Sequence, residues 1–177
     1  MADIKIVFAG FGGQGILFAG KLVAYKGLLE KKYVSCLPSY GPEMRGGTAN
    51  CSVIVSDEQI GSPMVPTPDI LMVMNGPSLD TFEDCVAPGG RIFADSSLID
   101  RRVRRTDVET FYVPASQMAN EAGMPALANM ILAGKLLKET PALSGGSIDA
   151  VLGKIISARH KDMLEQNRKA LEMGFAV

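Results

Sequence analysis

Two glycine-containing stretches carry the residue types from which a binding site could be built. The first, GFGGQG at residues 10–15, directly follows a short apolar run. Gly10, Gly12 and Gly15 have the spacing G-x-G-x-x-G, in which the backbone can approach a phosphate at the start of a helix. The candidates for binding a phosphate-containing ligand are therefore Gly10, Gly12, Gly13, Gln14 and Gly15.

The second stretch, SYGPEMRGGTAN at residues 39–50, combines a tyrosine, a carboxylate and a guanidinium with flexible glycines. These groups suit an anion or an interface more than a simple turn, although an ordinary solvated loop is the alternative. Asn75 follows an apolar run and can either join this loop or form a turn before Gly76 and Pro77. The candidates for an active-site or subunit-interface contact are Tyr40, Gly41, Pro42, Glu43, Arg45, Gly46, Gly47, Thr48 and Asn75.

The glycine motif by itself leaves three interpretations open. The glycines can serve only the packing of a helix on a strand, they can bind a nicotinamide or flavin nucleotide, or they can meet another phosphate-rich ligand or a partner's loop. A dinucleotide site would place an acidic residue at the end of the second strand. That strand ends here in Leu37, Pro38 and Ser39, and Glu30 precedes it.

The order of hydrophobic patterns predicts a three-layer α/β/α, Rossmann-like fold in which one mostly parallel sheet has helices on both faces. We expect Ser147 to cap a helix and Gly174 to end the last one. Residues 1–177 should form a single domain. The expected strands are residues 3–10, 33–37, 48–55, 69–75, 91–95 and 109–114, and the expected helices are residues 16–28, 78–85, 115–121, 125–138, 147–156 and 161–174.

The composition excludes several classes of protein. The net charge is -1, with 47% hydrophobic and 21% charged residues, so a nucleic-acid partner is not expected. No apolar run approaches the roughly 20 residues of a membrane helix, which favours a cytoplasmic protein without a membrane contact. Cys36, Cys51 and Cys85 should be reduced core thiols rather than metal ligands or disulfides, and the single histidine, His160, should be exposed. We expect no catalytic and no metal-binding residue.

Residues 10–24, 38–63 and 129–140 together resemble the gamma subunit of 2-oxoacid:ferredoxin oxidoreductases. The resemblance extends from Ile4 to about Glu139. It implies a part in the oxidative decarboxylation of a 2-oxoacid with coenzyme A, which gives acyl-CoA and carbon dioxide while ferredoxin is reduced. The chain has no Gly-Asp-Gly thiamine signature and no closely spaced cysteines. Thiamine diphosphate and the iron-sulfur clusters are therefore expected on other subunits.

The same resemblance implies that the chain is inactive alone and packs against alpha and beta subunits, and possibly a ferredoxin-like delta subunit, where it completes the active site and helps to bind coenzyme A. In isolation the chain can form a homodimer that covers this surface. The oxoacid, whether 2-oxoglutarate, pyruvate, a branched-chain acid or indolepyruvate, should be selected by the larger subunits. The alternative is a free-standing NAD(P)-binding oxidoreductase of Rossmann type, in which Arg45 holds a 2′-phosphate.

Overall fold

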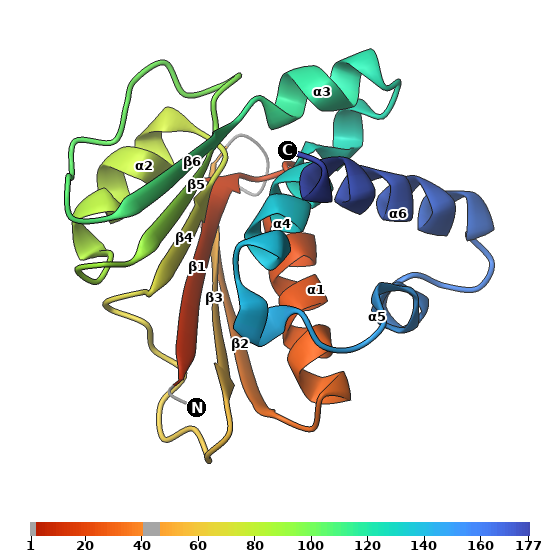
Figure 1. Ribbon diagram of the computed structural model, residues 1–177, viewed down its shortest axis with the longest axis horizontal. Helices are drawn as coiled ribbons and strands as arrows, with labels where there is room; N and C mark the ends of the chain where they lie inside the picture. Colours follow the sequence, from red (N-terminus) through yellow and green to blue (C-terminus); the bar gives the residue numbers. More distant parts are fainter. Residues whose placement is uncertain (1–2, 41–46) are drawn as a thin grey trace.

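A six-stranded sheet organises the part of the chain that the computed structural model describes, residues 3–40 and 47–177 (Figure 1). The strand order is β2-β3-β1-β4-β5-β6. The pairs β1–β4, β4–β5 and β5–β6 are parallel, whereas β3 is antiparallel to both β1 and β2. This arrangement confirms the predicted α/β class with a mostly parallel sheet. The strands are β1 (Ile4–Phe11), β2 (Tyr33–Tyr40), β3 (Thr48–Ser56), β4 (Ile70–Val73), β5 (Arg91–Asp95) and β6 (Glu109–Val113).

The central strands are apolar on both faces because both faces are covered. In β1, Ile6 and Phe8 belong to the larger hydrophobic cluster, and Val7 and Ala9 belong to the smaller cluster on the opposite face. Every residue of β4 is buried. The non-alternating sequences of these strands therefore follow from their central position.

The edge strand β2 is longer than the sequence predicts. It continues through Pro38 to Tyr40, where residues 33–37 were expected. Pro38 cannot donate a hydrogen bond to a neighbouring strand, which made it resemble a strand end, but an edge strand tolerates proline because one side has no partner. β2 pairs with β3 over its whole length, from Tyr33 opposite Ser56 to Tyr40 opposite Ala49.

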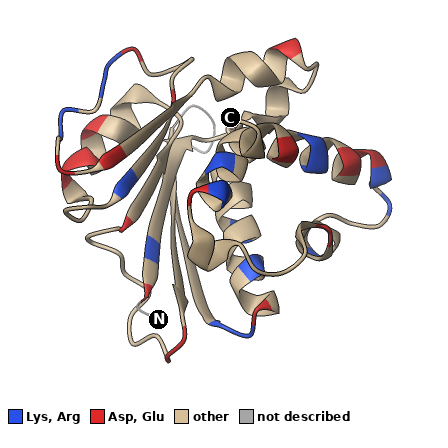
Figure 2. Ribbon diagram, viewed as in Figure 1, with Lys and Arg blue, Asp and Glu red and all other residues tan. Residues whose placement is uncertain are grey.

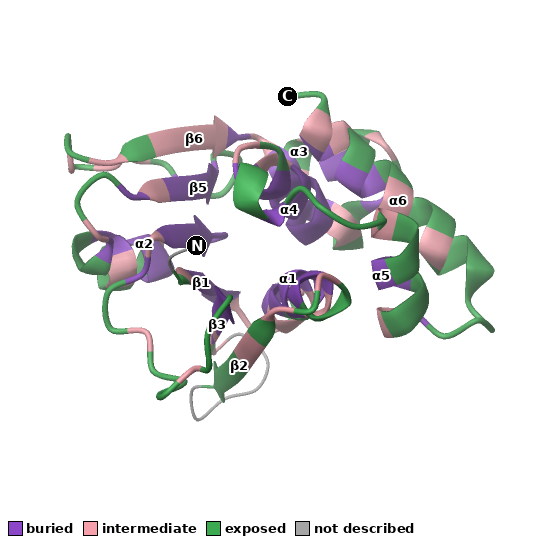
Figure 3. Ribbon diagram, turned by 60° about the horizontal axis from the view of Figure 1, so that its bottom comes forward, coloured by how far each residue is buried: buried purple, intermediate pink, exposed green. Residues whose placement is uncertain are grey.

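The two faces of the sheet are covered unequally (Figure 3). The smaller cluster lies beneath α2 (Gly76–Phe82), the 3-10 turn η1 (Glu83–Cys85) and parts of residues 65–108. Helices thus cover both faces, as expected, but one layer is thin. The other face carries α1 (Ile16–Leu29), α3 (Ala115–Glu121), η2 (Pro125–Leu127), α4 (Ala128–Lys138), η3 (Pro141–Leu143), α5 (Ile148–Ile155) and α6 (Lys161–Phe175).

One of the two caps predicted for the C-terminal helices is present. Ser147 caps α5, because its side chain accepts a hydrogen bond from the amide of Ala150. The prediction that Gly174 ends the last helix is wrong, since α6 continues to Phe175. Gly174 instead lies where α6 crosses α4, and a Cβ atom there would lie 2.0 Å from the carbonyl oxygen of Ile131.

The crossing of α4 and α6 is close enough to require glycine on both helices. A Cβ atom added to Gly134 of α4 would lie 2.4 Å from the carbonyl oxygen of Leu171. α4 is rich in buried apolar side chains of the larger cluster, to which α6 adds Ala170 and Leu171. No helix in residues 3–40 and 47–177 has the length and apolar character needed to cross a membrane.

We expect Gly134→Ala to lower the free energy of unfolding by about 2–4 kcal/mol, because the methyl group forces the two backbones apart. Equilibrium urea unfolding measures this change. Gly153→Ala in α5 is the matched control, since a Cβ atom at Gly153 has no heavy atom within 4 Å. It should be neutral or stabilise by up to about 1 kcal/mol. Equal losses in both variants would contradict the close-crossing explanation.

Candidate functional site

The two glycine-containing stretches meet at one rim of the sheet. β1 and β2 run in the same direction because each is antiparallel to β3, so their carboxyl ends lie at the same edge. Phe11 is opposite Thr48, and the amide of Gly12 donates a hydrogen bond to the carbonyl oxygen of Gly47 over 2.8 Å. The turn after β1 therefore contacts the end of the segment that connects β2 to β3 (Figure 1).

Gln14 fixes the turn after β1. Its Oε1 accepts a hydrogen bond from the amide of Phe11 at 2.7 Å, and its Nε2 donates to the carbonyl oxygen of Met74 at 3.0 Å. A single side chain thus joins the β1 turn to the end of β4. A Cβ atom at Gly10 would lie 2.6 Å from Gln14 Oε1, so the first glycine of the motif makes room for this side chain.

Gly13 and Gly15 have left-handed backbone conformations, with φ values of 95° and 74°. Gly15 also approaches α4, where Asn129 Nδ2 donates to its carbonyl oxygen over 3.0 Å. A Cβ atom at Gly15 would lie 2.3 Å from that nitrogen. Sequence reasoning missed Asn129 because it lies 114 residues further along, inside an apolar helical pattern.

The first turn of α1 begins without a side-chain cap. Its amides therefore keep the partial positive charge of a helix N-terminus available to an anion. Residues 6–20 contain no charged side chain that could compete for them. Figure 2 shows that charged residues lie elsewhere along the chain, among them those of α6.

A cavity of about 360 Å³ opens beside this helix N-terminus. It combines residues of the glycine turn with Tyr40 and Ala49 of the paired strands β2 and β3. Tyr40 is 50% exposed, so its ring and hydroxyl are accessible at the rim. The backbone donors and the aromatic side chain can therefore act on one ligand or one partner segment.

A second cavity, of about 640 Å³, lies at the switch point of the sheet. From β1 the chain passes through α1 to β2 on one side, and from β4 it passes through α2 to β5 on the other side. Ligands of open α/β sheets gather at such a point, outside the carboxyl ends of the strands. Phe11 borders both cavities, which makes them adjoining parts of one rim.

Asn75 lines the second cavity and has the turn-forming role, one of the two that the sequence left open. Its Oδ1 accepts a hydrogen bond from the amide of Ser78 at 2.7 Å and so caps α2. The side chain is 3% exposed, and its buried Nδ2 has no hydrogen-bond partner among the described residues. This nitrogen is a spare donor at the edge of the cavity.

The segment after β5 contributes to the same cavity, which sequence reasoning did not foresee. Arg101 lines it, and Arg101 Nη2 lies 2.6 Å from both Asp80 Oδ1 and Glu83 Oε2. Its charge is thus balanced by neighbouring carboxylates. No local pattern indicates these contacts, because the partners lie about twenty residues apart in a segment of mixed charge.

Nine of the fourteen predicted site residues lie in the described part of the chain, and they all lie at or beside the carboxyl rim. Among the described residues, no group of three or more His, Cys, Asp or Glu side chains could hold a metal ion. The candidates that lie outside the described residues are Gly41, Pro42, Glu43, Arg45 and Gly46, and their roles stay predictions.

The cysteines differ from the expectation of three core thiols. Cys51 is buried, but Cys36 and Cys85 are exposed. Cys36 lies on the edge strand, where its side chain receives no cover from a further strand. His160 is exposed, as predicted.

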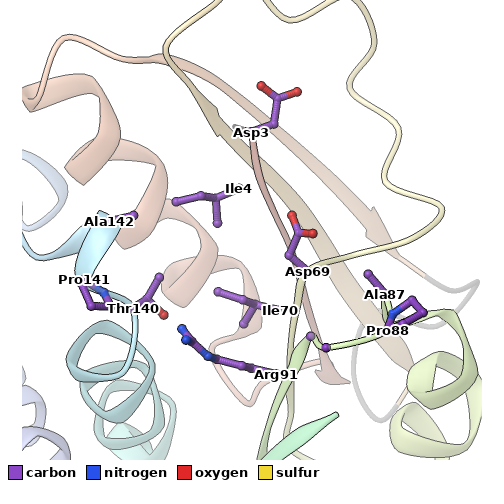
Figure 4. Close-up of a pocket in the computed structure, with 12 residues that line it drawn as sticks. Asp3, Ile4, Asp69, Ile70, Ala87, Pro88, Arg91, Thr140, Pro141 and Ala142 are labelled. Carbon is purple, nitrogen blue, oxygen red and sulfur yellow. The ribbon is translucent and has the colours of Figure 1, made fainter. Parts of the chain in front are cut away.

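A separate cavity of about 530 Å³ lies at the opposite rim, at the amino ends of β1, β4 and β5 (Figure 4). Arg91 faces it, but the guanidinium is held by the carbonyl oxygen of Glu139 at 2.6 Å and by Glu109 Oε2 at 3.2 Å. Asp3 and Asp69 add negative charge. This cavity contains none of the predicted site residues and does not join the candidate site.

Comparison with known proteins places the chain in a family. The family model described as pyruvate ferredoxin/flavodoxin oxidoreductase matches residues 5–177. The chain belongs to this family. The resemblance in residues 10–24 and 38–63 is therefore confirmed at the level of the whole chain.

Curated members of the family include subunits of several oxidoreductases. Ketoisovalerate oxidoreductase subunit VorA of Methanothermobacter thermautotrophicus is 37% identical over 97% of this chain, which spans 36% of VorA. This chain therefore corresponds to about a third of that relative. The 2-oxoglutarate synthase subunit KorC of Methanocaldococcus jannaschii is 32% identical over 98% of this chain and 92% of KorC.

Two solved structures of the family share the fold. The gamma subunit of a keto/oxoacid ferredoxin oxidoreductase from Geobacter sulfurreducens has a TM-score of 0.79 at 28% identity, covering 98% of this chain and 96% of that one. The 2-oxoglutarate:ferredoxin oxidoreductase from Magnetococcus marinus, with 2-oxoglutarate, coenzyme A and succinyl-CoA bound, has a TM-score of 0.88 at 25% identity. The match covers 99% of this chain and 31% of that chain.

We expect Gln14→Leu to lower the free energy of unfolding by about 1–3 kcal/mol, because the Phe11 amide and the Met74 carbonyl oxygen both lose their partner. Urea unfolding measures the loss, and amide hydrogen exchange should accelerate at Phe11. Gln117→Leu is the matched control. The side-chain Nε2 of Gln117 donates a hydrogen bond to the exposed Glu121 carboxylate. Losing this bond should change the free energy of unfolding by less than about 0.5 kcal/mol. If Gln14→Leu matched this control, Gln14 would not fix the turn.

Proposed function

We propose that this chain is the gamma-type subunit of a multi-subunit, thiamine-dependent 2-oxoacid:ferredoxin oxidoreductase. The assembly converts a 2-oxoacid, coenzyme A and oxidised ferredoxin into acyl-CoA, carbon dioxide and reduced ferredoxin. We propose that it works in the cytoplasm. The observation that carries the proposal is the meeting of the glycine turn with the end of β2 and the start of β3, in a chain of this family. That rim is a docking place without a catalytic side chain of its own.

Coenzyme A is the ligand that the rim suits best within this reaction. Its phosphates are anions that uncapped amides at the start of a helix can bind, here those around Gly12 to Gly15 and the first turn of α1. Tyr40 lines the same cavity and can pack against the ligand or a partner segment. The family's Magnetococcus structure, whose name includes coenzyme A and succinyl-CoA, supports this choice.

The other cofactors do not fit the residues of this chain. A cubane or two-iron cluster requires four ligands, usually cysteines, whereas only Cys36 and Cys51 lie together here and no three possible ligands gather among the described residues. The proposal therefore assigns the iron-sulfur clusters and thiamine diphosphate to alpha, beta and ferredoxin-like delta partners. The role of this chain is then to position coenzyme A and to complete the active site from one side, with no proton transfer by its side chains.

In a complex assembled by co-expression with alpha and beta partners, we expect Tyr40→Ala to raise the KM for coenzyme A by about tenfold, which corresponds to ~1.4 kcal/mol. Steady-state acyl-CoA formation measures the change. Tyr33→Ala is the matched control, because Tyr33 lies at the other end of the same strand and is 52% exposed. The purified chain without partners should show no turnover, and turnover by the chain alone would contradict a non-catalytic role.

Hydrogen exchange gives a second readout that does not depend on turnover. Coenzyme A should slow exchange at the amides of residues 12–18 in the assembled complex, while those of β6 should not change. Protection confined to other regions would place the ligand elsewhere. Calorimetry with NADPH and NADH distinguishes the alternative of a free-standing oxidoreductase: micromolar binding to the isolated chain would favour that alternative and count against the subunit role.

A further inference from the structure

The side chains of Cys36 and Cys51 meet across the pair of strands β2 and β3. Their sulfur atoms lie 3.4 Å apart. Cys36 is opposite Val53 and Cys51 is opposite Pro38, so the two cysteines are diagonal neighbours on one face of the sheet. A disulfide bond requires a separation of about 2.05 Å, so the sulfurs need to approach by roughly 1.4 Å.

The two sulfurs have different surroundings. Cys36 is exposed on an edge strand, whereas Cys51 is fully buried beneath α1. A Cβ atom at Gly20 of α1 would lie 2.8 Å from Cys51 Sγ, which shows how closely the helix covers it. Because Cys36 is exposed and Cys51 is buried, an oxidant from solvent can reach Cys36 but not Cys51. β2 pairs with only one neighbour, so it can shift toward β3 without breaking a second set of strand pairs.

Electrostatics separate the two thiols further. The hydrogen bond with Cys51 lowers the pKa of Cys36 to about 7; burial opposes this shift, and the charge of Lys21 supports it. The same hydrogen bond, together with burial, raises the pKa of Cys51. Near neutral pH, about half of Cys36 is thus a thiolate that accepts the S–H of Cys51.

We propose that Cys36 and Cys51 form a redox modification site for hydroperoxides, in which Cys36 is the attacking thiol and Cys51 the resolving thiol. Three observations support this proposal: the contact between the two sulfur atoms, the exposure of Cys36 and the burial of Cys51. It is independent of the subunit function. The product is an intramolecular disulfide between β2 and β3.

The reaction balances with hydrogen peroxide as the oxidant. The Cys36 thiolate attacks one oxygen of the peroxide, the O–O bond breaks, and the departing hydroxide takes a proton to become water. Conversion of Cys36 to the sulfenic acid removes the thiolate that accepts the S–H of Cys51, and this hydrogen bond is the main cause of the raised pKa of Cys51. Cys51 Sγ then attacks Cys36 Sγ, the S–S bond forms as the S–O bond breaks, and the hydroxide leaves as water with the Cys51 proton. Two thiols lose two electrons and two protons, and the peroxide is reduced to two waters.

The position of the bond connects oxidation to the candidate site. A Cys36–Cys51 disulfide closes a ring that contains Tyr40 and Gly47, two residues at the rim. It would fix the base of this hairpin. Cys85 lies outside the ring, and its Sγ donates a hydrogen bond to the carbonyl oxygen of Thr81 at 4.0 Å.

Thiol counting on the full chain tests the proposal. With a small excess of hydrogen peroxide, the number of titratable thiols in the wild-type protein should fall from three to one. The mass of the protein should fall by two units, and the protein should migrate as a monomer on a non-reducing gel. Cys85→Ser should fall from two thiols to none. Cys36→Ser should keep both of its thiols under the same treatment, because Cys51 is shielded and Cys85 has no second thiol beside it among the described residues to form a disulfide.

Trapping the intermediate separates attack from resolution. In Cys51→Ser, dimedone should label Cys36, whereas in the wild type the disulfide should form first and block labelling. Peptide mapping identifies the labelled cysteine. A wild-type chain that keeps three thiols, that loses Cys85 first, or that forms only intermolecular disulfides would overturn the proposal.

The pH dependence of alkylation provides a test that a merely structural pair would not pass. In a Cys85→Ser background, the rate of Cys36 alkylation by iodoacetamide should have its midpoint near pH 7. Cys51→Ala removes the S–H donor, so the pKa should rise toward an ordinary thiol value of about 8.5 and the rate at pH 7 should fall roughly tenfold. Cys51→Ser keeps a donor and should retain most of the rate.

Lys21 on α1 and Cys51 on β3 are the groups that lower the pKa of Cys36, so Lys21→Gln should raise the midpoint of the alkylation rate only slightly. A Cys51→Ala profile equal to that of the parent would contradict the assigned roles.

Discussion

The candidate site depends on one constraint: β3 is inserted antiparallel between β1 and β2. Because each neighbour opposes β3, β1 and β2 run in the same direction and their carboxyl ends reach the same edge. The hydrogen bond from Gly12 to Gly47 exists only because of this pairing. A purely parallel doubly wound sheet would place the same two loops at one rim, but it would not hold the turn after β1 against the start of a paired strand.

Glycine residues allow close contacts between elements at several places in the structure. Gly10 makes room for Gln14, Gly15 approaches Asn129, and the pair Gly134 and Gly174 lets α4 cross α6. In each place a Cβ atom would lie less than 3.0 Å from a neighbouring atom. The glycine turn is therefore held by its surroundings, with hydrogen bonds to the end of β4 and to α4. Such a turn can present amides to a ligand with little conformational entropy to lose.

The switch point adds chemical diversity to this rim. The turn after β1, the cap of α2 and the segment around Arg101 come from three separate parts of the chain and line one cavity. Backbone donors, a spare amide nitrogen of Asn75 and a charge-balanced guanidinium are thereby brought together beside the carboxylates of Asp80 and Asp100. This chemistry suits binding and positioning, which fits a subunit that completes a site whose reactive cofactors belong to its partners.

The sequence by itself determined the α/β class, most elements of the fold and the two stretches at the rim. These features are local: the strand period, the apolar runs of β1 and β4, the cap at Ser147 and the glycine spacing are all readable within about fifteen residues. The family, too, follows from the linear combination of GGQG with YGPEMRGG, which the match over residues 5–177 bears out.

The tertiary structure alone decided which residues support those stretches. Pro38 looked like a strand end until its place on an edge was known, and Gly174 looked like a cap until α4 was found against it. Asn129, Arg101 and the contact between Cys36 and Cys51 depend on strand order and helix packing. Such contacts join residues that are distant along the chain, and their energies depend on three-dimensional neighbours that no local pattern contains.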